Sequence, residues 1–369
     1  MIALPLLKQY SLDQLNNISK NFYHEILDSA NGKITALPFI KQRMPFRTIS
    51  AGVTAQVISI GGSLFKTALI KPSNNKLFVL SNNKTKALPR LESYAVLAKL
   101  IKEELFPGIT YLAINFAYPL KPITRQGWLD GKLISGSKEH QLDDLIDQPI
   151  AKLLEIDFQK NLGRKIRVTI ANDTICLLLS GLSKAPSLQL IAGVIGTGLN
   201  FAFFLDRETI VNLESANFNR FSPTPTGELV DKHSQSPGQS IFEKEVAGAY
   251  LYQHFNLITN QHIQSTEELS KIAGDNAPPL TNIARQIIER SASLAACQMA
   301  ALSRFKEQQG VVNSKFIMEG NLFWEGWEYL NFIKHYCRAL KQPLADDQIV
   351  YIANSNLTGA AYLLTTAND

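Results

Sequence analysis

The amino-acid sequence predicts a two-lobed α/β protein. Its 369 residues exceed what one hydrophobic core usually covers, so two domains are expected. A strand, a glycine turn and a second strand follow one another twice, over residues 55–70 and over 190–204. This recurrence indicates a duplicated α/β unit.

The first half of the chain opens on an amphipathic helix and continues with strands. Leu15, Ile18, Phe22 and Ile26 recur at helical spacing, and Ser11 is placed to cap the helix N-terminus. The elements expected here are a helix over 11–29, strands over 55–60, 65–70 and 76–80, a helix over 89–106 and a strand over 111–118. A more polar stretch, 120–165, follows.

The second half repeats the strand pattern and then becomes rich in helix. The elements expected here are a strand over 166–170 that leads into a helix, a hairpin over 190–204, a strand over 209–214, helices over 239–255 and 281–309, a strand over 315–319, a helix ending near 340, a strand over 348–352 and a last helix from 358.

Composition argues against several classes of protein. The net charge of +5 comes from dispersed Lys and Arg residues, which does not suggest a nucleic-acid-binding arm. Cys176, Cys297 and Cys337 are far apart and odd in number, so neither a disulfide framework nor a metal cluster is expected. No stretch approaches the ~20 apolar residues of a membrane span. A cytoplasmic protein that binds neither nucleic acid nor membrane is therefore expected.

The two glycine turns are candidate phosphate sites. Glycine leaves backbone N–H groups accessible, and a nest of such groups binds phosphate. Gly61-Gly62 and Gly196-Thr197-Gly198 have this character. Either turn alone is more simply interpreted as an ordinary hairpin turn. Two such turns together favour a nucleotide-binding fold.

Several polar residues lie at strand ends or helix starts, where α/β proteins place their chemistry. Asn172-Asp173 follows a strand and precedes a helix, so Asp173 could accept a proton from a hydroxyl nucleophile, or the pair could merely cap the helix. Glu214 ends a predicted strand and Glu243 lies in a predicted helix. Taken alone, each of these two could equally be a solvated or capping carboxylate.

Four motifs in fixed order resemble the hexokinase family. Residues 236–251, SPGQSIFEKEVAGAYL, resemble the family segment P-G-x-x-x-F-E-K-x-x-x-G-x-Y-L. An N-D-T strand end (172–174), a G-T-G-x-N hairpin (196–200) and a V-N-x-E segment (211–214) precede it in the family's order. The resemblance extends to residues 37–45, 131–138 and 289–296, and so covers most of a compact chain.

The resemblance implies an actin-like (ribonuclease H-like) fold with a sugar cleft between a small and a large domain. Asp173 then corresponds to the catalytic base, and Lys138 stabilises developing charge. The hexose ligands it implies are Ser137, Lys138, Asn172, Asp173, Asn200, Glu214 and Glu243. The nucleotide contacts it implies are Gly61, Gly62, Ser63, Lys66, Gly196, Thr197, Gly198 and Gly320.

The implied reaction is transfer of the γ-phosphoryl group of ATP to the 6-hydroxyl of a hexose such as glucose. ATP and the Mg²⁺ carried with it are the expected cofactors, and no metal site of the protein's own is expected. The expected partners are the hexose and the nucleotide, in a monomer or homodimer. The expected domains are 46–171 with the C-terminal helix 358–369, and 172–357 with 1–45 packed on it.

The nucleotide side departs from the family pattern more than the sugar side does. Ser59 stands where the family's first phosphate hairpin has an Asp that helps to hold hydrated magnesium. Lys66 replaces an Arg, Leu64 a polar residue and Ala117 a sugar-contacting Ser, and residues 354–361 have lost a glycine-rich loop. A hexokinase-like sugar-binding regulator with weak or no activity is therefore the second hypothesis, and a structural actin-like scaffold the third.

Overall fold

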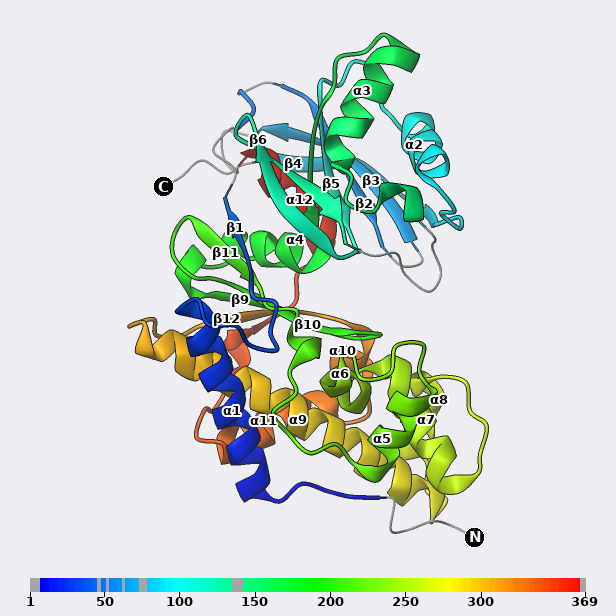
Figure 1. Cartoon of the computed structure of the whole chain (residues 1–369), viewed down its shortest axis with the longest axis vertical. Coiled ribbons are helices and arrows are strands. Elements are labelled where there is room, and N and C mark those ends of the chain that lie inside the picture. The colour runs from blue at the N-terminus through cyan, green and yellow to red at the C-terminus, as the bar shows by residue number, and fades with distance from the viewer. Residues whose placement is uncertain are drawn as a thin grey trace. The chain divides into compact units, whose positions relative to one another are not determined.

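The computed structural model describes residues 7–44, 48–50, 53–61, 64–72, 78–134 and 142–365. Most of its helices and strands are labelled in Figure 1. Ser11 caps the first helix, α1 (Leu12–Ala30), in a capping box with Gln14. The buried face of α1 includes Leu15, Ile18 and Phe22, as the spacing predicts.

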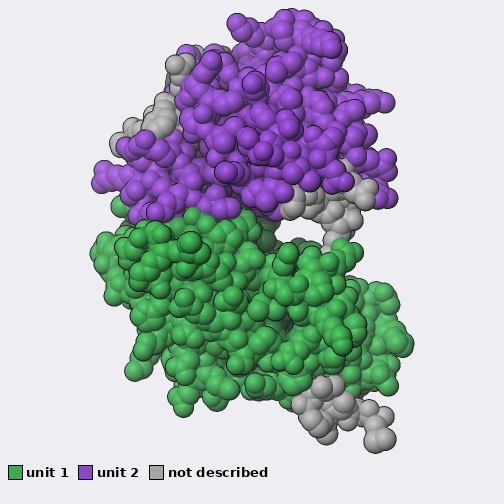
Figure 2. Space-filling model, in the orientation of Figure 1, with its two compact units in different colours: residues 1–39, 188–202, 212–351 green, residues 40–187, 203–211, 352–369 purple. Residues whose placement is uncertain are grey.

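Two compact units make up the chain (Figure 2). Unit 1 consists of Met1–Phe39, Leu188–Ala202 and Asn212–Tyr351, and unit 2 of Ile40–Ser187, Phe203–Val211 and Ile352–Asp369. Residues 172–187, which the sequence analysis assigns to the large domain, belong to unit 2. The domain limits expected from the sequence remain a prediction.

Unit 2 is built on a five-stranded sheet of order β4-β3-β2-β5-β8. Strands β2 and β3 and strands β3 and β4 pair antiparallel, whereas β5 runs parallel to both β2 and β8. The strands of this sheet are β2 (Ala55–Ile60), β3 (Leu64–Pro72), β4 (Phe78–Ala87), β5 (Tyr111–Phe116) and β8 (Arg167–Asn172). Parallel pairing brings the carboxyl ends of β2, β5 and β8 to one edge of the sheet.

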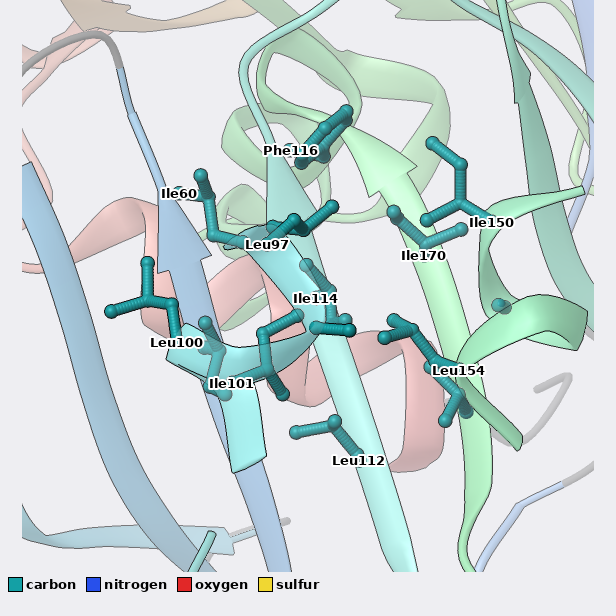
Figure 3. Packing of buried hydrophobic residues seen from close by; sticks show 14 of the residues in the cluster. Ile60, Leu97, Leu100, Ile101, Leu112, Ile114, Phe116, Ile150, Leu154 and Ile170 are labelled. Carbon is teal, nitrogen blue, oxygen red and sulfur yellow. The ribbon is translucent and has the colours of Figure 1, made fainter. Parts of the chain in front are cut away.

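One face of this sheet is covered by α2 (Tyr94–Glu103) and α3 (Ile150–Leu162). Figure 3 shows Leu97 of α2 and Leu154 of α3 packed against Ile114 of β5 and Ile170 of β8. The polar stretch 120–165 thus contributes to this core. It also forms the hairpin of β6 (Leu120–Arg125) and β7 (Trp128–Leu133), which the sequence analysis does not predict.

The last helix of the chain, α12 (Ser355–Thr365), packs on β2, β5 and β8 and on α4 (Asp173–Ser180). Helices α12 and α4 approach very closely at Gly359, where an added Cβ would lie 1.7 Å from the backbone oxygen of Cys176. Residues 354–361, which have lost a glycine-rich loop, therefore still contain one glycine, Gly359, that the close packing of α12 on α4 requires.

A second sheet has six strands in the order β1-β11-β10-β9-β12-β13. Strand β12 runs parallel to β9 and to β13. The strands of this sheet are β1 (Ile40–Arg43), β9 (Leu190–Ile195), β10 (Leu199–Phe204), β11 (Thr209–Asn212), β12 (Lys315–Glu319) and β13 (Ile349–Val350). Strand β11 ends two residues earlier than predicted, because Glu214 adopts a left-handed conformation with φ of 51°.

Helices make up much of unit 1. The long helix α9 contacts α1, α11 and α8, and its apolar residues are buried along most of its length. The helices of this unit, besides α1, are α5 (Pro225–His233), α6 (Ile241–Val246), α7 (Gly248–Thr259), α8 (Thr266–Gly274), α9 (Leu280–Gln308), α10 (Asn321–Glu325) and α11 (Tyr329–Ala339).

The prediction of one helix over 239–255 is wrong. The chain breaks at Ala247, which is extended with φ −79° and ψ 150°, and α6 and α7 are separate. The break brings Gly248 to the hairpin between β9 and β10, where its N–H donates to the oxygen of Gly196 at 2.7 Å. This tertiary hydrogen bond replaces a helical one, so local sequence pattern does not indicate it.

A buried polar network joins these helices. The Arg290 guanidinium lies 3.6 Å from the Glu245 carboxylate, and both side chains are fully buried. Glu245 also accepts hydrogen bonds from the backbone N–H and the hydroxyl of Thr224, at 2.6 and 2.8 Å. The network fixes α6, which bears Glu243, to α9 and to the start of α5.

None of the helices described here is long and apolar enough to cross a bilayer. Cys176, Cys297 and Cys337 are buried, and the structure forms no disulfide at these three positions.

Candidate functional site

Unit 1 brings two of the predicted hexose ligands into one hydrogen-bonded group. Asn200 lies on β10, and Glu214 lies in the turn after β11. Asn212, at the end of β11, accepts a hydrogen bond from Asn200 Nδ2 at 2.8 Å and donates one to Glu214 Oε1 at 2.8 Å. The sequence analysis does not name Asn212; an Asn at the end of an otherwise apolar strand was the available signal.

Glu243 reaches the same part of unit 1 from α6. Its Oε2 atom accepts a hydrogen bond from the backbone N–H of Leu199 at 2.9 Å. Leu199 is the residue before Asn200 and the first residue of β10. Three predicted ligands, Asn200, Glu214 and Glu243, are thus attached to one short segment of strand and to the turn beside it.

The glycine hairpin between β9 and β10 is clamped to the N-terminus of α7. The backbone oxygens of Gly196 and Thr197 accept hydrogen bonds from the N–H groups of Gly248 and Ala249, at 2.7 and 3.3 Å. The Thr197 side chain is exposed. Carbonyl oxygens of a hairpin would repel a phosphate. Here two of them already accept hydrogen bonds from the protein itself.

Gly320 belongs to the same group of close contacts. Its φ is +118°, and an added Cβ would lie 2.2 Å from the oxygen of Ile195. An added Cβ at Gly196 would lie 3.1 Å from the Cα of Gly320. Backbone packing alone therefore explains these two glycines, and contact with a nucleotide remains a prediction for them as for Thr197 and Gly198.

Asn172 and Asp173 lie in unit 2, at the carboxyl end of β8 and the start of α4. Asn172 caps α4, because its Oδ1 accepts a hydrogen bond from the N–H of Thr174 at 3.0 Å, and its Nδ2 donates to the oxygen of Tyr118 at 3.3 Å. The capping interpretation therefore holds for Asn172, which does not conflict with a ligand role.

Asp173 Oδ1 accepts hydrogen bonds from the N–H and the hydroxyl of Thr174, at 2.8 and 3.3 Å. Burial raises the pKa of the Asp173 carboxyl above its usual value, although hydrogen bonds from Thr174 and Asn172 act in the opposite direction. A raised pKa makes a carboxylate a stronger base toward a hydroxyl proton.

The first glycine turn is described only in part. Gly61 donates its N–H to the oxygen of Leu64 at 3.0 Å, and Lys66 lies opposite Ser59 in the β2–β3 pair. Ser59 is buried, and its hydroxyl accepts a hydrogen bond from Asn115 Nδ2 at 2.9 Å. The predicted nucleotide contacts Gly62 and Ser63 and the predicted hexose ligands Ser137 and Lys138 lie outside the described residues.

Over the ranges that the structure describes, no three or more His, Cys, Asp or Glu side chains gather as a metal site. The hydroxyl of Ser59 is a weaker magnesium-water partner than a carboxylate.

Comparison with protein families gives one match. The hexokinase family model matches residues 190–282 and 259–366. The hexokinase of Kluyveromyces lactis is 25% identical over 299 residues, which cover 69% of this chain and 59% of that protein. Hexokinase-2 of Arabidopsis thaliana is 29% identical over 213 residues, covering 51% of this chain and 40% of that protein. The chain therefore spans between 40% and 59% of the length of these two curated relatives.

Solved structures show the same fold at low identity. The hexokinase of Schistosoma mansoni in complex with glucose matches with a TM-score of 0.78 at 17% identity, covering 99% of this chain and 97% of that one. An ROK hexokinase of Thermus thermophilus matches with a TM-score of 0.55 at 15% identity, covering 84% of this chain and 98% of that one.

Proposed function

Because the chain belongs to the hexokinase family and has the two-lobed, actin-like α/β fold of sugar kinases, we propose that it phosphorylates a hexose such as glucose. The γ-phosphoryl group of ATP is transferred to the 6-hydroxyl of the sugar.

The main support for this proposal is the setting of Asp173. Its carboxylate stands where a parallel strand ends, and burial raises its pKa toward the range of a working general base. Thr174 holds one carboxylate oxygen from two sides, which restricts its rotation. Asp173 removes the proton of the hydroxyl nucleophile as the new bond to phosphorus forms.

The proposed sugar ligands have side chains that suit the hydroxyl groups of a hexose. Carboxylates and amides bind neutral hydroxyl groups through charge-assisted hydrogen bonds, each stabilising the complex by about 1.5 to 3 kcal/mol. In this proposal Asn200, Glu214 and Glu243 of unit 1 and Asn172 of unit 2 bind the hexose, together with Ser137 and Lys138. Lys138 also stabilises the charge that develops on the transferred group.

The nucleotide is ATP, and the family implies that Mg²⁺ accompanies it. Bound to the phosphates, the metal neutralises their charge. On the protein side, Gly61, Gly62, Ser63, Lys66, Gly196, Thr197, Gly198 and Gly320 are proposed to hold the phosphates and adenosine. The exposed side chain of Thr197, and the hydrogen bonds that hold its hairpin to α7, support the assignment of this second hairpin.

The test is an assay of ADP release with a panel of hexoses. Asp173→Ala should lower turnover by about 10²- to 10⁴-fold, the usual contribution of a positioned general base, while hexose binding measured by calorimetry persists. The matched control is Asp28→Ala, which removes a carboxylate of α1 that pairs with Lys33 at 2.8 Å and should leave turnover unchanged. Robust turnover in Asp173→Ala would place the base elsewhere.

A hexokinase-like sugar sensor with weak or no activity is the second candidate. The observation that favours it is Ser59, whose hydroxyl binds Asn115 where the family has a carboxylate. A sensor would release no hexose-dependent ADP at any magnesium concentration, yet hexose would still raise its thermal midpoint, because ligand binds only the folded state.

A further inference from the structure

A chain of hydrogen bonds in unit 1 links two backbone N–H groups to the carboxylate of Glu214. Asn200 Oδ1 accepts hydrogen bonds from the backbone N–H groups of Phe201 (2.8 Å) and Ser215 (3.2 Å). A backbone N–H group can only donate, so the amide oxygen of Asn200 must point toward these two groups. The amide NH₂ group of Asn200 therefore points the other way, toward Asn212.

Asn212 transmits this orientation to Glu214. Asn200 Nδ2 donates to Asn212 Oδ1 at 2.8 Å, so Asn212 Nδ2 is left to donate to Glu214 Oε1, also at 2.8 Å. The Asn212 side chain is only 3% exposed, so water does not compete for these bonds. Reversing either amide would bring like groups face to face. A hydrogen bond donated to Glu214 favours its ionised form.

We propose that Asn212 is a positioning residue that fixes Asn200 as a hydrogen-bond donor and Glu214 as an ionised acceptor toward the hydroxyl groups of a polyol ligand. The inference rests on the proposed function, in which Asn200 and Glu214 bind the hexose. A hydroxyl group both donates and accepts, so one hydroxyl, or two on neighbouring carbons, matches an amide N–H and a carboxylate together. A group that only accepts, such as a keto oxygen, does not match Glu214.

The backbone of Glu214 is held as firmly as its side chain. The residue is in the left-handed region, with φ 51° and ψ 50°, which is strained for a residue with a Cβ. Its carbonyl oxygen accepts hydrogen bonds from the N–H and the Nδ2 of Asn217, both at 3.1 Å. Asn212 and Asn217 therefore fix the carboxylate and the backbone of Glu214 separately, and substitutions can distinguish them.

The decisive variant is Asn212→Asp. The new carboxylate is nearly isosteric and still accepts from Asn200, but it faces Glu214 with an oxygen in place of a donor. Two carboxylates this close share a proton at low pH and repel each other once it is lost. Glucose affinity at pH 8 should fall roughly ten-fold to a hundred-fold and recover toward the wild-type value at pH 5, whereas wild-type affinity changes little over this range.

Asn217→Asp is the matched control. It adds the same charge to the same turn, but Asn217 contacts the backbone of Glu214 and not its carboxylate. The new carboxylate cannot donate to the Glu214 carbonyl oxygen, so glucose affinity should fall, but by a similar factor at pH 5 and at pH 8, because an aspartate that shares no proton with Glu214 is ionised at both. Asn212→Ala removes the link without adding charge, so its affinity should fall by roughly ten-fold at every pH. A purely structural role for Asn212 would give Asn212→Asp and Asn212→Ala the same pH profile.

A measurement without sugar separates the inference from the proposed function. The thermal midpoint of Asn212→Asp should fall below that of wild type increasingly from pH 5 to pH 8, because the folded state alone holds the two carboxylates together. If this gap widens and wild type binds no hexose, the proposed function fails and the orientation by Asn212 stands. If wild type binds hexose and Asn212→Asp shows neither pH effect, the inference is wrong.

Discussion

The carboxylate of Glu243 and the backbone of Leu199 are joined by a hydrogen bond of 2.9 Å between residues 44 positions apart. The contact leaves little space beside Gly198, where an added Cβ would lie 3.1 Å from Glu243 Oε2. A glycine in the hairpin and a carboxylate on α6 therefore depend on each other.

Gly198→Ala should displace the Glu243 carboxylate and weaken hexose binding by roughly ten-fold, the effect of one impaired charge-assisted hydrogen bond. Calorimetry with glucose measures this, and circular dichroism checks that the fold persists. The control is the double variant with Glu243→Ala, which should bind no more weakly than Glu243→Ala alone, since the alanine at 198 then has no carboxylate to displace. Additive losses would show that Gly198 acts independently of Glu243.

Asp173→Asn should be more stable than wild type at pH 8 and about 10²- to 10⁴-fold less active. Burial raises the pKa of Asp173 in the folded state above its unfolded value, so stability is lost as the pH rises from the unfolded pKa through the raised one. An amide removes this cost and still accepts from the N–H of Thr174.

The gap in thermal midpoint between Asp173→Asn and wild type should narrow as the pH falls toward about 4, because the folded-state carboxyl is then protonated and the unfolded-state carboxyl is about half protonated. Thermal unfolding from pH 8 to pH 4 measures it. A gap that is constant over this range would mean that ionisation of Asp173 is not the source of the difference.

Much of the fold follows from local pattern. Apolar runs on either side of a glycine turn predict both hairpins, β2–β3 and β9–β10. Strand β12 begins at Lys315 and ends at Glu319, as predicted. Pattern fails where a tertiary contact overrides it. The break at Ala247 depends on the hydrogen bond from Gly248 to Gly196, which joins residues far apart in sequence.

The sequence also predicted part of the candidate site. Motif order identified Asn200, Glu214 and Glu243, and the structure brings these three to one segment of unit 1. Asn212 was missed because its role lies in the direction of two amide hydrogen bonds, which no spacing encodes. The roles assigned to the site residues themselves remain predictions.

His254 should make the free energy of unfolding depend on pH in the acid range. Its ring is fully buried, and Nε2 donates to the oxygen of Lys244 at 2.8 Å, because a carbonyl oxygen only accepts. Nδ1 is then the acceptor for the hydroxyl of Thr226 at 2.7 Å and for Arg290 Nη2 at 3.0 Å. Burial, and then the Arg290 charge, lower the pKa of His254 to about 4.

A lowered folded-state pKa means that stability is complete above the unfolded value near 6.5 and is lost as the pH falls toward 4. The loss should reach about 3 kcal/mol, the free-energy equivalent of this difference in pKa. His254→Gln should flatten this part of the profile in urea unfolding from pH 7 to pH 4.5, and replacing the exposed His24 by Gln should not. Identical profiles for wild type and His254→Gln would assign the acid sensitivity to other groups.

Ser59→Asp tests whether the first phosphate hairpin limits activity. Ser59 and Lys66 are directly opposed on neighbouring antiparallel strands, so their side chains emerge on the same face of the sheet. Asn115 Nδ2 already donates to the Ser59 hydroxyl, and an aspartate could accept the same bond. The nearby Lys66 charge and this bond offset the cost of burying a carboxylate, so the variant should fold.

If the chain is a kinase, Ser59→Asp should raise hexose-dependent ADP release by roughly ten-fold when magnesium is limiting, about the effect of one added charge-assisted hydrogen bond, and by less when magnesium is in excess. Ser59→Asn is the control, since it has the same shape without the charge and should not raise activity. If wild type is inactive and Ser59→Asp is active, the chain is a sensor whose magnesium binding is limited by the missing carboxylate at position 59. A gain shared by Ser59→Asn, or no gain at any magnesium concentration, would mean that the missing carboxylate is not what limits phosphoryl transfer.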